Sequence, residues 1–275
     1  MPLTATRPHV DYTREGAAGP AVLLIMGFGM SGRVWRPQVD DLARTHQVAF
    51  YDHLGIGESE PPTHGATMAS MAGDAGRVLD ALDWADAHVV GVSMGGMIAQ
   101  ELALRAPSRV RSLTLIATHA GGLVAAMPRA EGLFHFAAAN LGQTHHRVAA
   151  LKRLLYTPEF LATVDGARLD ARIAEMAGKR APGRTLTGHL RAVLRHRTYR
   201  RLGRISAPTL VVRPGRDLLV HPRNSDVLAR VIPGARLVRF DDAGHGVTFQ
   251  RAADLNAELA RHFAEVDAQL GKRHV

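Results

Sequence analysis

A single serine between two glycines most constrains what this 275-residue chain can fold into. The β-branched run 88–92 passes through Gly91-Val-Ser93-Met-Gly95, and an alanine-containing, helix-forming stretch follows at once. A strand that turns this sharply into a helix needs glycines around the turn, because the backbone segments approach closely there. The turn holds the Ser93 hydroxyl in the open at the end of a sheet. The segment therefore predicts an α/β fold with an exposed serine at one sheet edge.

Strand-like and helix-like stretches alternate on both sides of this turn. Further strands are predicted at 21–26, 47–51, 110–117, 207–212 and 235–240, and the first two of these are expected to be buried. Helical stretches are expected at 67–82, 222–232 and 250–270. This alternation predicts a mostly parallel sheet covered by helices on both faces. Because parallel βαβ units are right-handed, the carboxyl ends of the strands, and the site, should share one edge.

The alternation stops after Gly121-Gly122, and the chain to about residue 200 resembles one helix after another. Apolar side chains at Leu186, Leu190 and Leu194 share one helical face, for example. We expect residues 1–121 and 201–275 to form one core domain. The insertion 122–200 is predicted to be a helical lid over the site.

The insertion also carries most of the charge. Residues 122–200 hold 13 Lys and Arg against 5 Asp and Glu. The excess of basic residues in this insertion is thus nearly the whole net charge of +9 of the chain. These basic residues are spread singly along helical stretches without interleaved aromatic residues, which predicts a solvated surface and no nucleic-acid site. A field that attracts acidic substrates is the alternative.

Composition removes several other classes. The chain has no cysteine, so disulfides, thiolate chemistry and Cys-ligated metals are excluded. No stretch approaches the roughly 18 apolar residues of a membrane helix, and the first residues lack a secretory h-region. There is no metal-ligand spacing and no phosphate-binding loop, so neither a metal nor a cofactor is expected. A cytoplasmic location without membrane attachment is predicted.

A serine nucleophile needs a base, and the base needs an orienting acid. Asp217 follows the strand predicted at 207–212, and His245 follows the one at 235–240, so both lie near the edge that holds Ser93. Asp241 and Asp242 are rival acids because they directly follow the last strand. We favour Asp217, since an acid and a histidine on separate loops can meet across the sheet edge.

Attack on a carbonyl also needs two donors for the oxyanion. We assign these roles to the backbone N–H groups of Met94, at a helix start, and of Phe28, in the loop after the first predicted strand. The predicted substrate-binding residues are Met26, Gly27, His119 and Met127.

The chain resembles the α/β-hydrolase superfamily over essentially its whole length. The matching segments are Leu24-Ile-Met-Gly-Phe-Gly29, Asp52-x-x-Gly-x-Gly-x-Ser59, Gly91-Val-Ser-Met-Gly95, Gly215-Arg-Asp217 and Gly244-His245. Within it the chain looks most similar to small cytosolic esterases, enol-lactonases and polyketide methylesterases. The resemblance implies an eight-stranded sheet, a lid inserted after the sixth strand, a Ser93–His245–Asp217 triad and no cofactor. Many relatives have His where this chain has Met26, and Arg in place of Leu54.

The function predicted from these residues is that of a serine hydrolase, a carboxylic ester hydrolase that cleaves an ester or lactone through an acyl-enzyme. An acyltransferase or a carbon–carbon bond hydrolase would use the same triad, and a ligand receptor on this scaffold is a further alternative. The expected partner is a small-molecule ester or lactone, anionic if the basic lid attracts it. A monomer or a homodimer is expected. The natural substrate stays open, because pocket size depends on how residues 122–200 fold.

Overall fold

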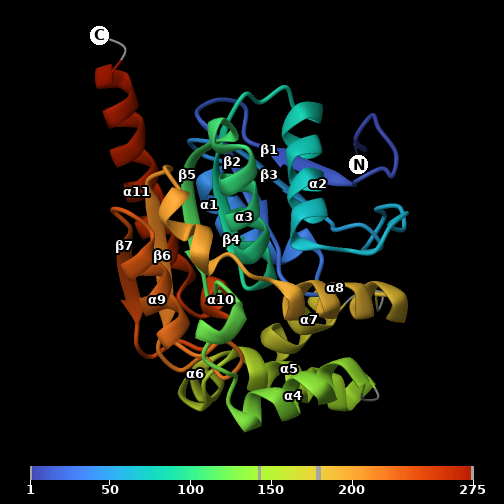
Figure 1. Ribbon diagram of the computed structural model, residues 1–275. Helices are drawn as coiled ribbons and strands as arrows, with labels where there is room; N and C mark the ends of the chain where they lie inside the picture. The colour runs from blue at the N-terminus through green and yellow to red at the C-terminus, as the bar shows by residue number, and fades with distance from the viewer. Residues whose placement is uncertain (1, 142–143, 178–180, 274–275) are drawn as a thin grey trace.

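The computed structural model describes residues 2–141, 144–177 and 181–273. Its centre is a seven-stranded sheet with the order β1-β3-β2-β4-β5-β6-β7 (Figure 1). The strands are β1 (Tyr12–Glu15), β2 (Ala21–Ile25), β3 (Gln47–Tyr51), β4 (Ala87–Val92), β5 (Val110–Ile116), β6 (Thr209–Pro214) and β7 (Arg236–Phe240). β1 is antiparallel to β3, and all other neighbouring pairs are parallel. The parallel strands therefore end at a common edge.

The expected strand count of eight is wrong: the described residues form seven strands. All six strands expected from the sequence are present, and the seventh is β1, which was not predicted. β1 lies at the edge of the sheet and buries only one of its four side chains, so it has no apolar run. The helical insertion also follows the fifth strand, β5, and not the sixth.

Helices cover both faces of the sheet. One face packs against α2 (Met68–Ala81), α3 (Met94–Arg105) and α9 (Arg223–Val231). The other packs against α1 (Arg36–Leu42), α10 (Val247–Gln250) and α11 (Ala252–Arg273). Side chains of the central strands β2, β4 and β5 alternate between the two cores, as strands buried on both faces require. Short 3-10 helices lie at Gly32–Trp35, Pro107–Arg109, Gly122–Val124 and Tyr199–Arg204.

Five helices between β5 and β6 lie together at the edge where the parallel strands end (Figure 1). They are α4 (Ala130–Leu141), α5 (Thr144–Leu155), α6 (Pro158–Thr163), α7 (Gly166–Ala177) and α8 (Gly183–Arg195). Buried side chains of α5 and α7 form a small core of their own, with Leu155, Leu169 and Ile173 among its members. We interpret 122–200 as a lid on a core of 1–121 and 201–275; this division stays a prediction.

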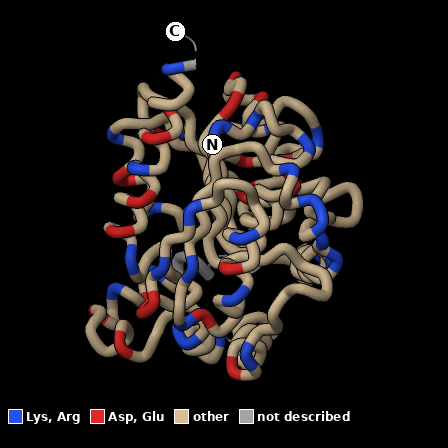
Figure 2. Tube along the Cα trace, turned by 60° about the vertical axis from the view of Figure 1, so that its left-hand side comes forward, with Lys and Arg blue, Asp and Glu red and all other residues tan. Residues whose placement is uncertain are grey.

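Basic and acidic positions are interspersed over the molecule (Figure 2). Within the insertion, Lys152 of α5 pairs with Asp170 of α7, and Glu159 of α6 reaches Arg216 of the core at 3.2 Å. Exposed pairs of this kind are screened by solvent and contribute little to stability.

Buried and partly buried histidines couple folding to pH. Burial lowers the pKa of His88, His189 and His196 to about 3, and that of His119 and His262 to about 4, from 6.5. Below pH 6.5 the unfolded chain binds protons that the folded chain does not, so the free energy of unfolding rises with pH between about 4 and 6.5.

We expect the melting temperature to fall steadily as the pH is lowered from 6.5 to 5, a range above most carboxylate titrations. Each buried histidine changes the free energy of unfolding by up to about 1.4 kcal/mol per pH unit. Thermal melts monitored by circular dichroism test this. The exposed His64 provides the control, because His64→Gln should leave the slope unchanged. A melting temperature independent of pH over this range would contradict the assignment of these histidines as neutral.

Candidate active site

Ser93 lies in a sharp turn between β4 and α3. It is the N-cap of α3 with φ 55° and ψ −120°, a strained conformation for a residue with a side chain. Its N–H donates to the carbonyl of Ile116 at 2.9 Å, and its carbonyl accepts from the Thr118 hydroxyl at 2.7 Å. These bonds to β5 and the following loop fix the turn, so the Ser93 side chain is held at the sheet edge.

The glycines of this turn are required by close backbone approach. A Cβ at Gly91 would lie 2.3 Å from the carbonyl oxygen of Gly95, and one at Gly95 would lie 2.1 Å from that of Ile25. We expect Gly95→Ala to prevent soluble expression or to lower the melting temperature strongly. Gly73 in α2 has nothing within 4 Å of its Cβ position. Gly73→Ala should therefore increase stability by about 0.5–1 kcal/mol. Equal melting temperatures for the two variants would show that the turn tolerates a side chain.

His245 and Asp217 meet across the sheet edge from the loops after β7 and β6. The distance from His245 Nδ1 to Asp217 Oδ2 is 2.7 Å. Asp217 is fully buried, and its Oδ1 accepts from the N–H groups of Leu219 and Val220, both at 2.8 Å. An ionised carboxylate accepts at Oδ2 as well, so His245 carries its proton on Nδ1. Nε2 is then free to act as a base.

The rival acids lie elsewhere. Asp241 and Asp242 are exposed, and Asp242 pairs with Arg251 at 2.6 Å. Gln250, which receives no role from the sequence, spans this loop: it accepts from the N–H of Gly244 and donates to the carbonyl of Asp242. The loop that carries His245 is thus fixed by hydrogen bonds that do not involve the carboxylates of the rival acids.

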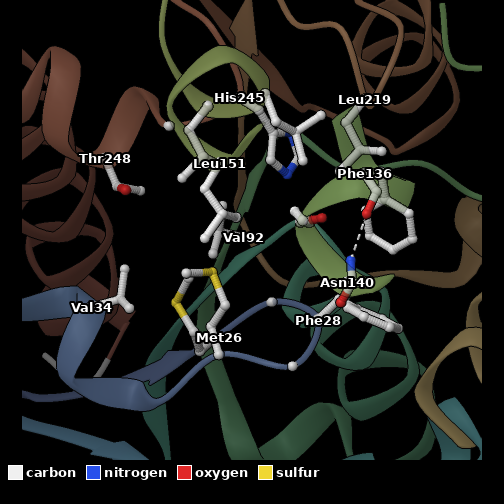
Figure 3. A pocket seen from close by; sticks show the side chains of 18 of the residues that line it. Met26, Phe28, Val34, Val92, Phe136, Asn140, Leu151, Leu219, His245 and Thr248 are labelled. Atoms are coloured by element: carbon white, nitrogen blue, oxygen red, sulfur yellow. Dashed lines mark hydrogen bonds between the residues drawn. The ribbon is translucent and has the colours of Figure 1, made fainter. Parts of the chain in front are cut away.

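Ser93 and His245 line one cavity of about 100 Å³. Figure 3 shows the His245 ring pointing into this cavity, with Met26 and Phe28 on the opposite side. Gly27 also lines it, and a Cβ at Gly27 would lie 3.3 Å from Ser93 Cβ. The absence of a side chain at this position leaves space for a substrate carbonyl beside the serine.

A second cavity of about 290 Å³ also reaches Ser93, and His245 is not among the residues that line it. Its wall includes Met94, Met97, His119 and Met127. The four residues predicted to bind substrate therefore divide between two cavities, with Met26 and Gly27 in the first and the other two in the second. Both cavities are also lined by Phe28, Phe136 and Leu219.

Two backbone donors flank the serine. The N–H groups of Phe28 and Met94 have no hydrogen-bond acceptor among the residues that the structure describes. Met94 is the first residue of α3, whose dipole favours negative charge at that end. The two N–H groups can both donate to the oxygen of a carbonyl group whose carbon Ser93 attacks.

Comparisons with known proteins identify the family to which this fold belongs. A family model described as "alpha/beta hydrolase fold" matches residues 20–252. The chain belongs to the α/β-hydrolase family. It is 34% identical, over 93% of its length and 96% of the relative, to a protein of Azorhizobium caulinodans named as a candidate carbamate hydrolase, RutD.

Solved α/β-hydrolase structures are similar as well. The enol-lactonase from Burkholderia xenovorans LB400 superposes with a TM-score of 0.83 at 25% identity, covering 96% of this chain and 100% of that one. A Mycobacterium tuberculosis H37Rv protein named as a candidate non-heme bromoperoxidase, BpoC, has a TM-score of 0.77 at 31% identity, with coverages of 94% and 96%. The resemblance to small esterases and lactonases is thereby confirmed at the level of the superfamily.

The motif from Asp52 to Ser59 supports the Phe28 loop of this α/β hydrolase. Asp52 Oδ1 accepts from the Ser31 hydroxyl at 2.8 Å and from the Gly32 N–H at 2.6 Å. A Cβ at Gly57 would lie 1.9 Å from Asp52 Oδ2, which accounts for glycine there. Asp52 therefore fixes the backbone that follows Phe28. Its carboxylate lines neither cavity.

Two buried histidines hold the same loop, and the sequence offered no signal for their arrangement. His53 Nε2 lies 2.8 Å from the carbonyl oxygen of Met26, and His189 Nδ1 accepts from the Gly29 N–H at 3.4 Å. Burial lowers the pKa of both, so each is neutral at pH 7. His53 itself lines neither of the two cavities. His119 does line the second cavity, and its Nδ1 accepts from the Gly121 N–H at 3.0 Å.

Neither a metal site nor a membrane span emerges from the part of this α/β hydrolase that the structure describes. No group of three or more His, Asp or Glu is placed there to hold an ion. None of its helices is both long enough and apolar enough to cross a bilayer.

Proposed function

We propose that this hydrolase cleaves a carboxylic ester or lactone, with Ser93 as nucleophile, His245 as base and Asp217 as its orienting acid. The observation that carries the proposal is the 2.7 Å bond between His245 and the buried Asp217, on a cavity that Ser93 also lines. A serine at its ordinary pKa needs such a base to become nucleophilic.

The mechanism has two halves. His245 Nε2 accepts the Ser93 proton as Oγ attacks the carbonyl carbon, and the N–H groups of Phe28 and Met94 bind the oxyanion. His245 then donates this proton to the leaving oxygen, and an acyl-enzyme remains. Water attacks the acyl-enzyme, its proton passes through His245, and the acid and free serine are released. Asp217 stays ionised throughout and stabilises the imidazolium.

The two cavities suggest where each half of the substrate binds. The leaving oxygen must lie near His245 to receive a proton, and His245 lines only the first cavity. We therefore assign the alcohol half to the first cavity and the acyl half to the larger, apolar second cavity. The substrate-binding roles of Met26, Gly27, His119 and Met127 follow this division. A small-molecule substrate, a monomer or homodimer and a cytoplasmic location complete the proposal.

Covalent labelling tests the nucleophile directly. A fluorophosphonate should label the protein at one site, found on the peptide that contains Ser93 by mass spectrometry, and should abolish hydrolysis of p-nitrophenyl butyrate. The unlabelled protein should also hydrolyse members of a panel of p-nitrophenyl esters and γ- and δ-lactones in the steady state. Labelling without turnover would favour a ligand receptor. Absence of both would overturn the proposal.

Carbamate hydrolysis is a second candidate, because the RutD-named relative is 34% identical over nearly the whole chain. The same serine could attack a carbamate carbonyl. Rates with p-nitrophenyl carbamates and matched esters would separate these substrates. Added alcohol or thiol acceptors would reveal acyl transfer, and a vinylogous diketone substrate would reveal carbon–carbon bond hydrolysis.

A further inference from the structure

We propose that Arg172 of α7 binds a carboxylate carried by the alcohol half of the substrate, an inference that rests on the proposed function. Arg172 lines the first cavity together with Ser93 and His245. The described residues around this cavity include two arginines, Arg147 and Arg172, and no Asp or Glu. Two basic residues of the insertion, Arg147 and Arg172, therefore line the cavity that contains Ser93.

Among the described residues, Arg172 has no carboxylate partner for its charge. It is half-buried, one Nη2 N–H donates to the carbonyl of Val34 at 3.0 Å, and its guanidinium lies 4.3 Å from the ring centre of Phe249. Tyr156 is its other polar neighbour, and burial raises the pKa of that phenol, so it is neutral at pH 7. Among the described residues no carboxylate lies within ion-pair distance of Arg172.

One donor of this guanidinium is buried with no hydrogen-bond partner. Arg172 Nε has none in the described structure. A buried donor without an acceptor and a buried charge without a counterion are both unfavourable. A carboxylate bound in the cavity would supply the negative charge and acceptor oxygens for the N–H groups of Arg172 that reach it. Arginine suits this role because its planar donors match the two oxygens of a carboxylate.

The carboxylate is assigned to the alcohol half because His245 and Arg172 line the same cavity. The group that leaves must be next to His245, so the cation in that cavity faces the leaving group and not the acyl chain. The rest of the wall is mostly apolar, with Val34, Leu151 and Leu154 among its members. The alcohol half therefore has a short aliphatic skeleton that ends in a carboxylate.

Two matched substrate pairs test this. The first pair places the charge on the alcohol half: the butyrate esters of 4-hydroxybutanoate and of 4-hydroxybutanamide. The second places it on the acyl half: the p-nitrophenyl monoesters of glutarate and of glutaramate. Carboxylate and amide have nearly the same shape, so the ratio of kcat/KM within a pair reports charge recognition. The unmodified protein should prefer the carboxylate in the first pair by about 10- to 100-fold, as expected for a charge-assisted hydrogen bond.

Arg172→Gln should remove that preference through a higher KM for the carboxylate, so that the two kcat/KM values of the first pair become similar. Arg172→Lys should retain part of it, because the charge is kept without the planar donors. Arg168→Gln is the matched control, since Arg168 is exposed on the same helix and lines neither cavity. Because ratios are compared, a partly destabilised variant remains informative.

A preference that survives Arg172→Gln, a dependence confined to the acyl pair, or no preference at all would overturn the inference. In each of those cases hydrolysis of the amide-bearing esters would still support the serine hydrolase. Failure to hydrolyse any of the four compounds, together with no fluorophosphonate labelling, would instead contradict the proposed function itself.

Discussion

Ser93→Ala should lower kcat/KM for p-nitrophenyl butyrate by about 10⁴-fold or more, with the fold intact. The change removes one oxygen atom, and the bonds that fix the turn involve the backbone of Ser93 and the hydroxyl of Thr118. Without Oγ no acyl-enzyme forms, so the burst of p-nitrophenol and the fluorophosphonate label should both disappear. Stopped-flow absorbance and intact-protein mass spectrometry measure these effects.

Ser108→Ala is the matched control, because Ser108 is exposed and lies in the 3-10 helix after α3. It should keep full activity and full labelling. The circular dichroism spectra of the two variants should match, and their melting temperatures should agree within a few degrees. A Ser93→Ala protein that retains turnover above one tenth of the original rate would remove Ser93 from the mechanism.

Much of the fold could be predicted because its signals are local. The central parallel strands are buried on both faces and so contain continuous apolar runs, such as Ala21–Ile25, whose five side chains are all buried. β1 escaped because an edge strand with the sequence Tyr-Thr-Arg-Glu shows neither a run nor clear turn residues. The expected eighth strand came from resemblance alone, and nothing local to the chain supported it.

The candidate site divides in the same way. Ser93, Asp217 and His245 follow predicted strands, so parallel topology alone brings them to one edge. The helical insertion obeys no comparable rule, since its packing depends on contacts with the core. Gly55, for example, packs so closely on α8 that a Cβ would lie 2.4 Å from Thr185 Oγ1. The sequence could therefore indicate a basic insertion but could not indicate that Arg172 lines the same cavity as Ser93.

Asp217→Asn should lower kcat by about 10⁴-fold at pH 7 while KM changes little. Asp217 Oδ1 accepts two backbone N–H groups, so the amide oxygen of Asn will take that position and its NH₂ group will face His245. An NH₂ group donates, so Nδ1 must become an acceptor and the histidine proton must move to Nε2. The ring can then no longer accept the proton of Ser93, although every side chain keeps its place.

The rival acids supply the control for this prediction. Asp242 forms only an exposed pair with Arg251, so Asp242→Asn should change kcat by less than about twofold and stability by roughly 0–1 kcal/mol. Asp241→Asn should behave likewise. Steady-state kinetics and the rate of fluorophosphonate labelling, measured for all three variants, rank the acids independently of substrate binding. A larger loss in Asp242→Asn than in Asp217→Asn would mean that the 2.7 Å bond to Asp217 fixes the loop and does not orient the base.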